Sequence, residues 1–458
     1  MSENVHSTAT ETGPVSPRSG GRPLVMIIGG GFGGLEVARG LSGLDAEVVL
    51  LDRTNHHVFQ PLLYQVATAS LSPASISAPI RSAVAGCDNC QVVLADVIGI
   101  DVEQKRVHVE EGSAAYDYLV LAVGARHDYF GNDEWESIAP GLKTIEDATE
   151  IRRRMLLAFE SAEHEADPDA RRAALTFGII GGGPTGVELA GAIKSIASRT
   201  LPKEYRNIDT ATARVILFEG GPRVLGGFPE KLSARARSDL ERLGVEVHVD
   251  TRVTALDERG VHVGEEFIAA QNVFWAAGVR ASPILEDLGV PLDRSGRVVV
   301  GPDLSIPGRP EVFVVGDAAS YTPAGEERPL PGVAQVAMQM GRYAARVVRE
   351  EIEGAGSGVR TRPFAYRDKG SMAIIGKYKA VVSMGHRSFA GFVAWLLWAG
   401  VHIAFLVGFR NRLRVMFNWM AAWLLDSHDA RLIVGDSKLR IKTPQGEGFE
   451  PAPEDDGS

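Results

Sequence analysis

The sequence has little cysteine, no excess of basic charge and no apolar segment near its start. Its two cysteines, Cys87 and Cys90, cannot form a disulfide framework, which indicates a reducing compartment. The formal net charge of −10 argues against a nucleic-acid partner. The polar segment 1–21 is not typical of a secretory signal, and we expect a disordered tail there. We expect the acidic segment 437–458 to be mostly disordered as well.

One stretch near the N-terminus has the pattern of a dinucleotide-binding unit. It combines an apolar strand, three spaced glycines, a helical segment, a second strand and a terminal acid: Leu24–Ile28, Gly29, Gly31, Gly34, Glu47–Leu51 and Asp52. Gly29 permits a tight turn, Gly31 lets a pyrophosphate approach the main chain, and Gly34 lets helix and strand pack closely. The helix N-terminus attracts phosphate, and Asp52 can bind ribose hydroxyls. The alternative is a glycine-rich turn in an ordinary α/β domain.

The pattern occurs a second time. Its parts are Leu175–Ile180, Gly181, Gly183, Gly186, a helix over Val187–Ser198, a strand over Arg214–Phe218, and Glu219. Glu219 favours a free ribose 2′-hydroxyl over a 2′-phosphate, and so NADH over NADPH, although Arg223 nearby could take a phosphate. Glu188 falls in the first turn of the helix, facing the nucleotide. We expect a functional role for it; the alternative is a surface acid stabilised by the helix dipole.

Three further strands complete the two units: Tyr118–Ala125, Val273–Gly278 and Val312–Ala319. The first ends in a turn of small residues that lets the chain pass close to a cofactor. The last carries Gly316 and Asp317, where an acid can reach ribityl hydroxyls and a following helix can point at pyrophosphate. A charged surface helix is expected over Ile151–Ala166, ending near Pro168.

Two pairs of side chains, one of histidines and one of cysteines, could have either a chemical or a structural role. His56 and His57 could be catalytic, but we favour packing or hydrogen bonding near the cofactor. Cys87 and Cys90 have the C-x-x-C spacing of redox pairs. They lie in an expected loop before a strand over Gln91–Asp96, far in sequence from both glycine motifs, so a redox role is disfavoured.

The two nucleotide units, the turn Ala122-Val-Gly-Ala125 and the late Gly316-Asp317 resemble the two-dinucleotide-binding flavoprotein reductases over residues 22–350. Three stretches narrow the resemblance to the type II NADH dehydrogenases, which are single-subunit NADH:quinone oxidoreductases that pump no protons. These stretches are Phe59-Gln-Pro-Leu-Leu-Tyr-Gln-Val-Ala67, Gly181-Gly-Gly-Pro-Thr-Gly-Val-Glu188 and Ala334-Gln-Val-Ala-Met-Gln339.

The resemblance implies a set of binding residues. For non-covalent FAD they are Gly29, Gly31, Phe32, Gly33, Gly34, Asp52, Arg53, Gln60, Ala122, Gly124, Gly316, Asp317, Ala334 and Gln335. Asp52 replaces the glutamate that is common in the superfamily. For NADH they are Gly181, Gly183, Pro184, Thr185, Gly186, Glu188, Glu219, Ala277 and Gly278. No metal is expected.

The same resemblance implies the electron acceptor and the catalytic residues. Gln335 and Gln339 lie four residues apart, share a helix face and would bind a quinone, with menaquinone as one candidate. Lys377 matches a lysine near that pocket, although Lys379 is close enough to compete for the assignment. Glu188 would relay protons or sense the charge-transfer state. A homodimer is implied by the resemblance alone.

Two rival functions remain. A sulfide:quinone oxidoreductase has a similar architecture but needs redox cysteines near the flavin, and Cys87 and Cys90 are poorly placed for that. A non-catalytic flavoprotein that senses NADH would leave the paired glutamines and the C-terminal region unexplained.

The C-terminal region has the composition of a membrane anchor. Phe389–Gly408 carries no formal charge, Val415–Leu425 is again apolar, and the basic group Arg410-Asn-Arg412-Leu-Arg414 lies between them. A transmembrane helix and a buried core or dimer hairpin are the alternatives. We favour an in-plane anchor over about residues 389–425, on the cytoplasmic face of the inner membrane. The expected interfacial residues are Trp395, Trp398, Trp419 and Trp423, with the arginines meeting anionic lipids.

The predicted fold is α/β, with an NADH-binding Rossmann-like domain inserted in an FAD-binding one and a C-terminal helical region. With 45% hydrophobic and 23% charged residues, the chain should hold two or three such domains. We expect an FAD domain at 22–125 and 290–350, an NADH domain at 126–289, and a quinone and membrane region at 360–436.

Overall fold

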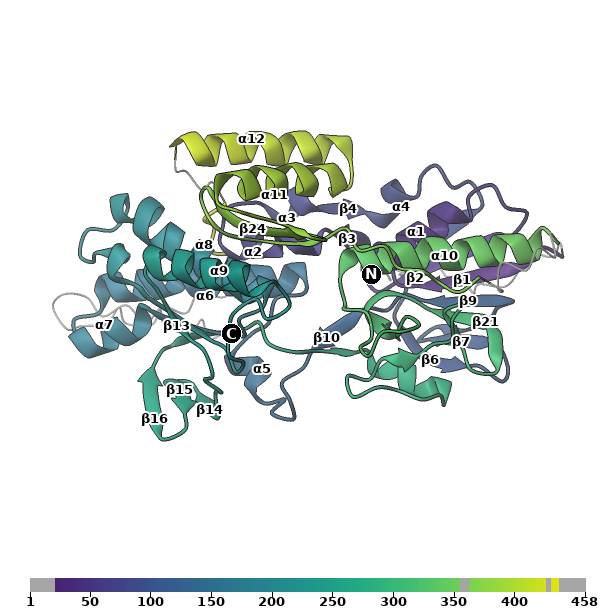
Figure 1. Ribbon diagram of the computed structural model, residues 1–458, viewed down its shortest axis with the longest axis horizontal. Coiled ribbons are helices and arrows are strands. Elements are labelled where there is room, and N and C mark those ends of the chain that lie inside the picture. Colours follow the sequence, from purple (N-terminus) through teal and green to yellow (C-terminus); the bar gives the residue numbers. More distant parts are fainter. Residues whose placement is uncertain (1–20, 355–361, 426–429, 436–458) are drawn as a thin grey trace, which may run out of the picture. The chain divides into compact units, whose positions relative to one another are not determined.

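The computed structural model describes residues 21–354, 362–425 and 430–435 (Figure 1). The chain forms two compact units. The first unit contains Met1–His57, Pro79–Arg126 and Arg280–Arg367, and the second contains Val58–Ala78, His127–Val279 and Asp368–Ser458. Apart from Gly21, both expected tails lie outside the described residues. Four short strands lie where the chain passes between units: β3 (His56–Val58), β4 (Ser77–Pro79), β10 (Ala125–His127) and β18 (Val279–Ala281).

The first unit is built on a six-stranded sheet in the order β20-β21-β9-β1-β2-β5. The strands are β20 (Ser305–Ile306), β21 (Arg309–Val314), β9 (Tyr118–Leu121), β1 (Leu24–Ile28), β2 (Glu47–Asp52) and β5 (Cys90–Leu94). All neighbours pair in parallel except β20 and β21. The carboxyl ends of β1, β2, β9 and β21 therefore meet at one edge, where open α/β sheets bind ligands.

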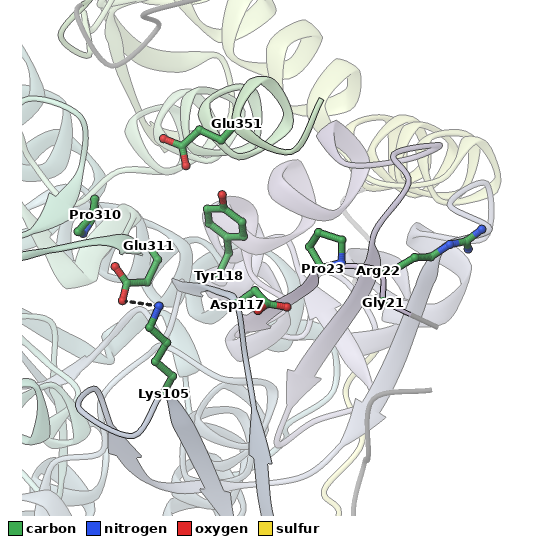
Figure 2. A pocket seen from close by; sticks show the side chains of 9 residues that line it. All are labelled: Gly21, Arg22, Pro23, Lys105, Asp117, Tyr118, Pro310, Glu311 and Glu351. Atoms are coloured by element: carbon green, nitrogen blue, oxygen red, sulfur yellow. Dashed lines mark ion pairs between the residues drawn. The ribbon is translucent and has the colours of Figure 1, made fainter. Parts of the chain in front are cut away.

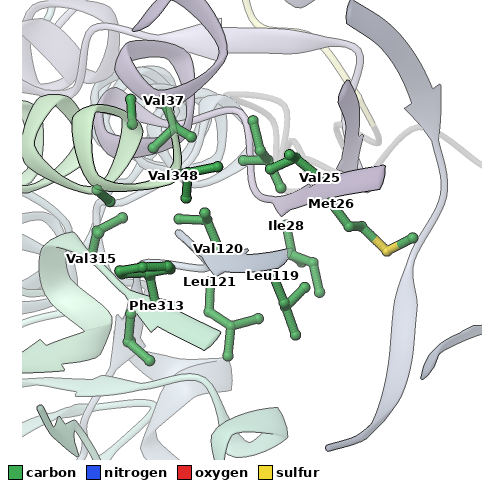
Figure 3. Packing of buried hydrophobic residues seen from close by; sticks show 14 of the residues in the cluster. Val25, Met26, Ile28, Val37, Leu119, Val120, Leu121, Phe313, Val315 and Val348 are labelled. Atoms are coloured by element: carbon green, nitrogen blue, oxygen red, sulfur yellow. The ribbon is translucent and has the colours of Figure 1, made fainter. Parts of the chain in front are cut away.

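Helices α1 (Phe32–Gly40) and α10 (Ala334–Ile352) pack against each other and against this sheet. Figure 3 shows Val37 of α1 and Val348 of α10 together with side chains of β1, β9 and β21, and both valines are fully buried. The helices can approach closely because a β-carbon at Gly341 would overlap the carbonyl oxygen of Gly33. The core thus fixes the position of the loop between β1 and α1.

Smaller elements complete the first unit. They are α4 (Ile80–Ala83), the antiparallel strands β6 (Val97–Asp101), β7 (Arg106–Val109) and β8 (Gly112–Ala115), the pair β19 (Val298–Val299) and β22 (Ala319–Ser320), and the 3₁₀ turns η5 (Pro283–Leu288) and η6 (Gly316–Ala318).

The second unit contains a four-stranded parallel sheet in the order β13-β12-β11-β17. Its strands are β11 (Thr176–Ile180), β12 (Arg214–Phe218), β13 (Val245–His248) and β17 (Asn272–Trp275), and its principal helices are α6 (Ile145–His164), α8 (Pro184–Ser195) and α9 (Glu230–Leu243). The remaining elements before the C-terminal region are η1 (Gln60–Leu62), α2 (Leu63–Ala67), α3 (Pro73–Ile76), α5 (Trp135–Ile138), α7 (Pro168–Ala174), η2 (Ile196–Thr200), η3 (Leu201–Lys203), η4 (Thr210–Thr212), β14 (Ala255–Asp257), β15 (Gly260–Val263) and β16 (Glu266–Ala269).

The C-terminal region folds as part of the second unit. An antiparallel sheet of β23 (Ser371–Gly376), β24 (Lys379–Met384) and β25 (Arg387–Ala390) is followed by α11 (Phe392–Phe405) and α12 (Phe409–Leu425). Strand β23 packs on α8, where a β-carbon at Gly191 would overlap the carbonyl oxygen of Ile375. In the described part of the chain, we find no helix with the length and apolar character needed to cross a bilayer.

The α/β class and the nested nucleotide folds are confirmed, but several boundaries differ from those expected. The chain returns to the first unit at Arg280 rather than 290, and Val58–Ala78 belongs to the second unit, because α2 packs against α6 and α8. Helix α6 begins at Ile145, before the expected Ile151, because Thr144 and Asp147 form a capping box.

Candidate functional site

The first glycine loop has the geometry that a dinucleotide needs. Gly29 has φ +103°, and a β-carbon there would overlap the carbonyl oxygen of Ala122. A β-carbon at Gly34 would overlap the carbonyl oxygen of Gly29, so helix and turn lie in contact. Gly31 precedes α1 as its N-cap and has open space where a side chain would stand. The N-terminus of α1 is therefore open to a phosphate group.

The acid at the end of β2 is held against this loop. Gly30 donates its main-chain N–H to Oδ2 of Asp52 at 2.6 Å, and Thr54 donates its N–H to Oδ1 at 2.7 Å. A carboxylate oxygen accepts more than one hydrogen bond, so Asp52 can still take a ribose hydroxyl. Arg53 follows as an exposed residue.

The remaining expected FAD residues of the first unit follow the neighbouring strands. Ala122 comes directly after β9, Gly124 has φ +68°, and Gly316 has φ +71° with its N–H on the sulfur of Met340 at 3.3 Å. Asp317 lies in η6, and α10 begins at Ala334. A side-chain-free loop, an open helix N-terminus and two acids fit an adenine dinucleotide. Gln60 is exposed and belongs to the second unit, so its assignment to FAD stays a prediction.

A different surface pocket of the first unit lies at the opposite edge of the sheet (Figure 2). Pro23, Asp117 and Tyr118 line it at the amino ends of β1 and β9. Lys105 and Glu311 form an ion pair of 3.0 Å on its wall. Because dinucleotides bind at the carboxyl ends of such strands, this pocket is separate from the FAD site.

The second glycine loop repeats the first in detail. Gly181 has φ +111°, and a β-carbon at Gly186 would overlap the carbonyl oxygen of Gly181. Gly183 is the N-cap of α8 with open space beside it, and Pro184 opens the helix. Gly182 and Gly221 donate their N–H groups to Glu219, each at 2.6 Å.

The other expected NADH residues line the same edge. Thr185 lies in the first turn of α8, and Ala277 follows β17. At Gly278, φ is +53° and a β-carbon would meet the ring of Phe130 at 2.5 Å. Arg223 donates to the carbonyl oxygen of Gly226 at 3.0 Å, so its guanidinium is engaged within its own loop.

Glu188 is held in the second unit where α8 meets β23. Its Oε1 accepts the N–H of Ile374 at 3.2 Å. Burial raises the pKa of its carboxyl to about 8, and the Ile374 hydrogen bond opposes this shift. A carboxyl with a pKa in this range can both hold and release a proton near neutral pH.

The expected quinone residues are divided between the units. Gln335 and Gln339 lie on α10 of the first unit, whereas Lys377 follows β23 in the second. The amide of Gln339 is engaged twice by one residue, since Nε2 donates to the Arg367 carbonyl at 2.9 Å and Oε1 accepts its N–H at 3.0 Å. Each amide atom retains capacity for another bond. That these residues meet around a quinone stays a prediction.

The surroundings of His57, Cys87 and Cys90 favour structural roles over chemical ones. His57 is buried, its Nδ1 lies 3.0 Å from the Gly30 carbonyl oxygen, and burial lowers its pKa to about 4. Cys87 packs in the core, and burial raises the pKa of the Cys90 thiol to about 12, with the neighbouring Cys87 adding to the shift. A thiol that resists ionisation is a poor nucleophile, which argues against redox exchange. Within the described ranges, no cluster of potential metal ligands occurs.

The interfacial role expected of the tryptophans is wrong for the three whose side chains are described. Trp395, Trp398 and Trp419 are 3%, 1% and 4% exposed, because they turn toward the protein interior. The side chain of Trp423 lies outside the described residues. The exposed apolar side chains of the two helices include Phe392, Val393, Leu396, Phe405, Phe417 and Met420.

Sequence reasoning missed a buried hydrogen-bonded group in the second unit. Trp419 donates to Gln65, and Gln65 donates to the hydroxyl of Tyr64. Tyr64 and Gln65 lie inside the segment that resembles a flavin-adjacent stretch, but nothing local in the sequence links them to a tryptophan near the C-terminus.

Comparisons with known proteins agree with this architecture. A family model described as pyridine nucleotide-disulphide oxidoreductase matches residues 23–341, and one described as the NDH2 C-terminal domain matches residues 369–427. The chain is 42% identical over 450 residues to the type II NADH:quinone oxidoreductase Ndh of Mycobacterium tuberculosis, covering 95% of this chain and 96% of the relative. It is 43% identical over 414 residues to NdhA of the same organism, with 87% of each chain covered.

Solved structures show the same fold. The NDH2 of Plasmodium falciparum in complex with NADH matches with a TM-score of 0.82 at 19% identity, over 90% of this chain and 100% of that one. The sulfide:quinone oxidoreductase of Aquifex aeolicus matches with a TM-score of 0.66 at 18% identity, over 89% and 96%. The chain therefore belongs to the pyridine nucleotide-disulphide oxidoreductases and, within them, to the type II NADH:quinone oxidoreductases.

Proposed function

We propose that this protein oxidises NADH and passes two electrons through FAD to a membrane quinone, without pumping protons. The observation that carries the proposal is that one chain holds two complete nucleotide loops followed by an NDH2-type C-terminal domain. FAD, when bound, accepts a hydride and releases electrons one or two at a time. The protein supplies binding, orientation and proton transfer.

The two loops have separate tasks. The open helix end beside Gly31 holds the pyrophosphate of FAD, and Asp52 binds its ribose. The corresponding end beside Gly183 holds the pyrophosphate of NADH. Glu219 accepts hydrogen bonds from the NADH ribose and repels the additional phosphate of NADPH. Glu188 lies just after the first turn of that helix, where it can exchange a proton during reduction.

The acceptor site is assigned to Gln335, Gln339 and Lys377. Amide N–H groups can donate to quinone carbonyl oxygens, and Lys377 can supply a positive charge or a proton as the quinol forms. The main-chain hydrogen bonds of Gln339 to Arg367 hold its amide in one orientation. Menaquinone is the candidate acceptor.

The hairpin of α11 and α12 provides the membrane contact. Its exposed apolar side chains, with Phe392 and Phe417 more than half exposed, lie beside exposed Arg410 and Arg412. An apolar surface beside basic groups suits a lipid interface with anionic head groups. We place this surface on the cytoplasmic face of the membrane. A homodimer belongs to the proposal through family resemblance only.

Stopped-flow absorbance of the purified holoenzyme without oxygen tests the proposal. NADH should reduce the flavin, and so remove its oxidised absorbance, within the time of one turnover. NADPH should reduce it much more slowly. A menaquinone analogue should reoxidise the reduced flavin and restore that absorbance. Flavin reduction by sulfide, abolished by Cys87→Ser, would instead support the rival oxidoreductase. A flavin that NADH reduces but that no quinone reoxidises would support the NADH sensor.

Sealed vesicles test the absence of pumping. Turnover of the reconstituted protein should consume NADH without acidifying or alkalising the lumen beyond the protons of the chemical reaction. A protonophore-sensitive gradient proportional to turnover would contradict the proposal.

A further inference from the structure

The main chain of Gly30, inside the first glycine loop, is held at both of its polar atoms. Its N–H donates to Oδ2 of Asp52 at 2.6 Å, and Nδ1 of His57 lies 3.0 Å from its carbonyl oxygen. A β-carbon at Gly30 would meet Cδ1 of Ile80 at 2.5 Å. All four residues belong to the first unit. Gly30 is therefore fixed by two side chains and has no space for a side chain of its own.

The bond to Gly30 determines which nitrogen of His57 carries the proton. A carbonyl oxygen can only accept, so Nδ1 must donate. Burial lowers the pKa of His57 to about 4, so the ring is neutral near pH 7 and holds a single proton. Nε2 is therefore unprotonated, and it has no hydrogen-bond partner among the described residues. The ring is 2% exposed and meets the ring of Phe32 edge-on, with centroids 4.9 Å apart.

The same bond sets the direction of the next N–H group, that of Gly31. A trans peptide is planar, and its C=O and N–H point in opposite directions, so the Gly31 N–H is directed away from His57. Within the described part of the chain this N–H has no acceptor, and open space lies where a side chain of Gly31 would stand. Because this peptide joins two glycines, sterics alone leave its orientation open. The bond from His57 selects one orientation.

The second loop holds the equivalent carbonyl without a side chain. Gly182 donates its N–H to Oε2 of Glu219 at 2.6 Å, as Gly30 does to Asp52. The carbonyl oxygen of Gly182 accepts the main-chain N–H of Leu225 at 2.7 Å. In both units the segment after the terminal acid returns to the loop, but the donor is an imidazole in the first and a main-chain N–H in the second. Removing the imidazole should therefore affect one nucleotide and not the other.

We propose that His57 is a positioning residue for FAD, which holds the Gly30 carbonyl so that the Gly31 N–H faces the pyrophosphate. The imidazole acts through the loop, and it does not need to touch the cofactor. This inference rests on the proposed function, because it takes the first loop as the FAD site.

Three substitutions separate the hydrogen bond from the packing of the ring. In His57→Asn the amide nitrogen is attached to Cγ, as Nδ1 is, so it can donate to the Gly30 carbonyl. In His57→Gln the amide nitrogen lies one bond farther out, near the place of Nε2, so the bond is lost. His57→Leu removes every donor and leaves a buried carbonyl oxygen unpaired.

His56→Asn is the matched control, because it makes the same substitution one residue earlier. Nδ1 of His56 lies 3.0 Å from Oδ1 of Asn55 on the exposed side of the chain. Among the described residues, His56 makes no hydrogen bond to the glycine loop. The control therefore removes an imidazole from the same strand and leaves the Gly30 carbonyl held.

Release of FAD from the diluted holoenzyme, followed by the fluorescence of free flavin, provides the first test. Release should be about 10-fold to 100-fold faster in His57→Leu and His57→Gln, and within about threefold of the native rate in His57→Asn. His56→Asn should release FAD at the native rate. Calorimetric titration of each FAD-loaded variant with NAD⁺ should give the native affinity, since Leu225 holds the second loop.

Nuclear magnetic resonance provides a second test that a purely structural role would not satisfy. In the native holoenzyme, the ¹⁵N signals of His57 should show the proton on Nδ1. The ³¹P signals of the bound pyrophosphate should shift in His57→Leu and His57→Gln and keep their native positions in His57→Asn.

Four results would overturn the inference. They are a proton on Nε2 of native His57, native FAD release in His57→Leu, equally fast release in His57→Asn and His57→Leu, and an equal loss of NAD⁺ affinity. The third would show that packing of the ring against Phe32 matters rather than the hydrogen bond. Should His57→Leu fail to fold, His57→Asn and His57→Gln make the same comparison. Because these measurements need no turnover, a holoenzyme that NADH cannot reduce would refute the proposed function and leave them readable.

Discussion

Glu36 and Glu188 occupy the same position in the two nucleotide loops, two residues after the third glycine of each. In the first unit, Glu36 pairs with Arg342 of α10 at 2.6 Å and with Arg39 at 3.5 Å. In the second unit, Glu188 accepts the main-chain N–H of Ile374, and burial raises its pKa to about 8. The first glycines of the two loops have similar φ angles of +103° and +111°.

The difference arises from what packs against each helix. Helix α1 meets α10, which brings Arg342 to Glu36. Helix α8 meets α2 and β23, which carry no arginine or lysine, as well as β12, η2 and α9, which do. No ion pair joins any of these basic groups to Glu188 among the described residues. Glu36 is therefore held in ion pairs, while the carboxyl of Glu188 has its pKa raised by burial. The same local motif acquires chemistry only where its neighbours remove the counter-charge.

The largest effect is expected from adding a side chain to the third glycine of either loop, which packs against the first glycine. In Gly34→Ala and Gly186→Ala the new methyl group overlaps a main-chain carbonyl oxygen, so the loop must open. Gly34→Ala should abolish FAD retention. Gly186→Ala should keep FAD but slow its reduction by NADH at least about 100-fold. Flavin absorbance and stopped-flow rates measure both.

Gly227→Ala is the control for this pair, because open space surrounds that glycine. It should retain FAD and reduce it at the normal rate. If Gly186→Ala lost FAD as completely as Gly34→Ala, the assignment of the loops to two different nucleotides would fail.

The next effect concerns the pH dependence of stability. The pKa of Glu188 is raised on folding, so the folded protein binds its proton more tightly and gains stability at low pH. That contribution is full below the ordinary carboxyl pKa of about 4.5 and is lost as pH rises through about 8. Relative to Glu188→Gln, the native protein should therefore lose thermal stability between about pH 4.5 and 8.

Thermal unfolding of the holoenzyme at several pH values measures this difference. Glu36→Gln should follow the native pH dependence, since its partners are arginines that stay charged. Parallel curves for the native protein and Glu188→Gln would show that Glu188 is not protonated in the folded state.

A smaller effect is expected at the acids that end β2 and β12. Glu219→Gln keeps the side-chain length but loses the charge-assisted bond to ribose, which should raise the KM for NADH about tenfold and narrow the preference over NADPH. Asp52→Asn should leave that KM unchanged and weaken FAD retention. An effect of Asp52→Asn on KM alone would reverse the two nucleotide assignments.

The smallest effect is expected from Glu36→Gln. Its ion pair with the half-exposed Arg342 should contribute about 1 kcal/mol or less to the free energy of unfolding. Urea denaturation measures this loss, and a double-mutant cycle with Arg342→Gln isolates the pair. Slower flavin reduction in Glu36→Gln at unchanged FAD content would argue against a purely structural role.

The parts of the fold that were predicted correctly depend on local constraints. The strand, glycine turn and helix at 24–40 and again at 176–195 follow from positive φ angles and close contacts that only glycine tolerates. The positions of Asp52 and Glu219 at the carboxyl ends of β2 and β12 follow from the lengths of the two strands. Such features are separated by few residues, so their spacing in the sequence carries the information.

Other expectations failed because they depended on distant partners. Trp395, Trp398 and Trp419 have the residue type of a lipid interface, yet they pack inward and leave aliphatic and phenyl side chains exposed. The quinone role of Gln339 stays a prediction, but nothing in the sequence indicated that its amide also binds the main chain of Arg367. Neither the burial of an indole nor the second partner of an amide can be read from its neighbours in sequence.

The sequence by itself determined that this chain binds two dinucleotides, because each loop encodes its turn, its helix end and its acid within about 45 residues. It did not show what surrounds Glu36 and Glu188, which stand at equivalent points of the two glycine loops. Tertiary structure determined those surroundings, since α10 supplies Arg342 to Glu36, while β23 supplies a main-chain N–H to the partly buried Glu188. The cost of removing a carboxylate from water raises the pKa of Glu188 to about 8.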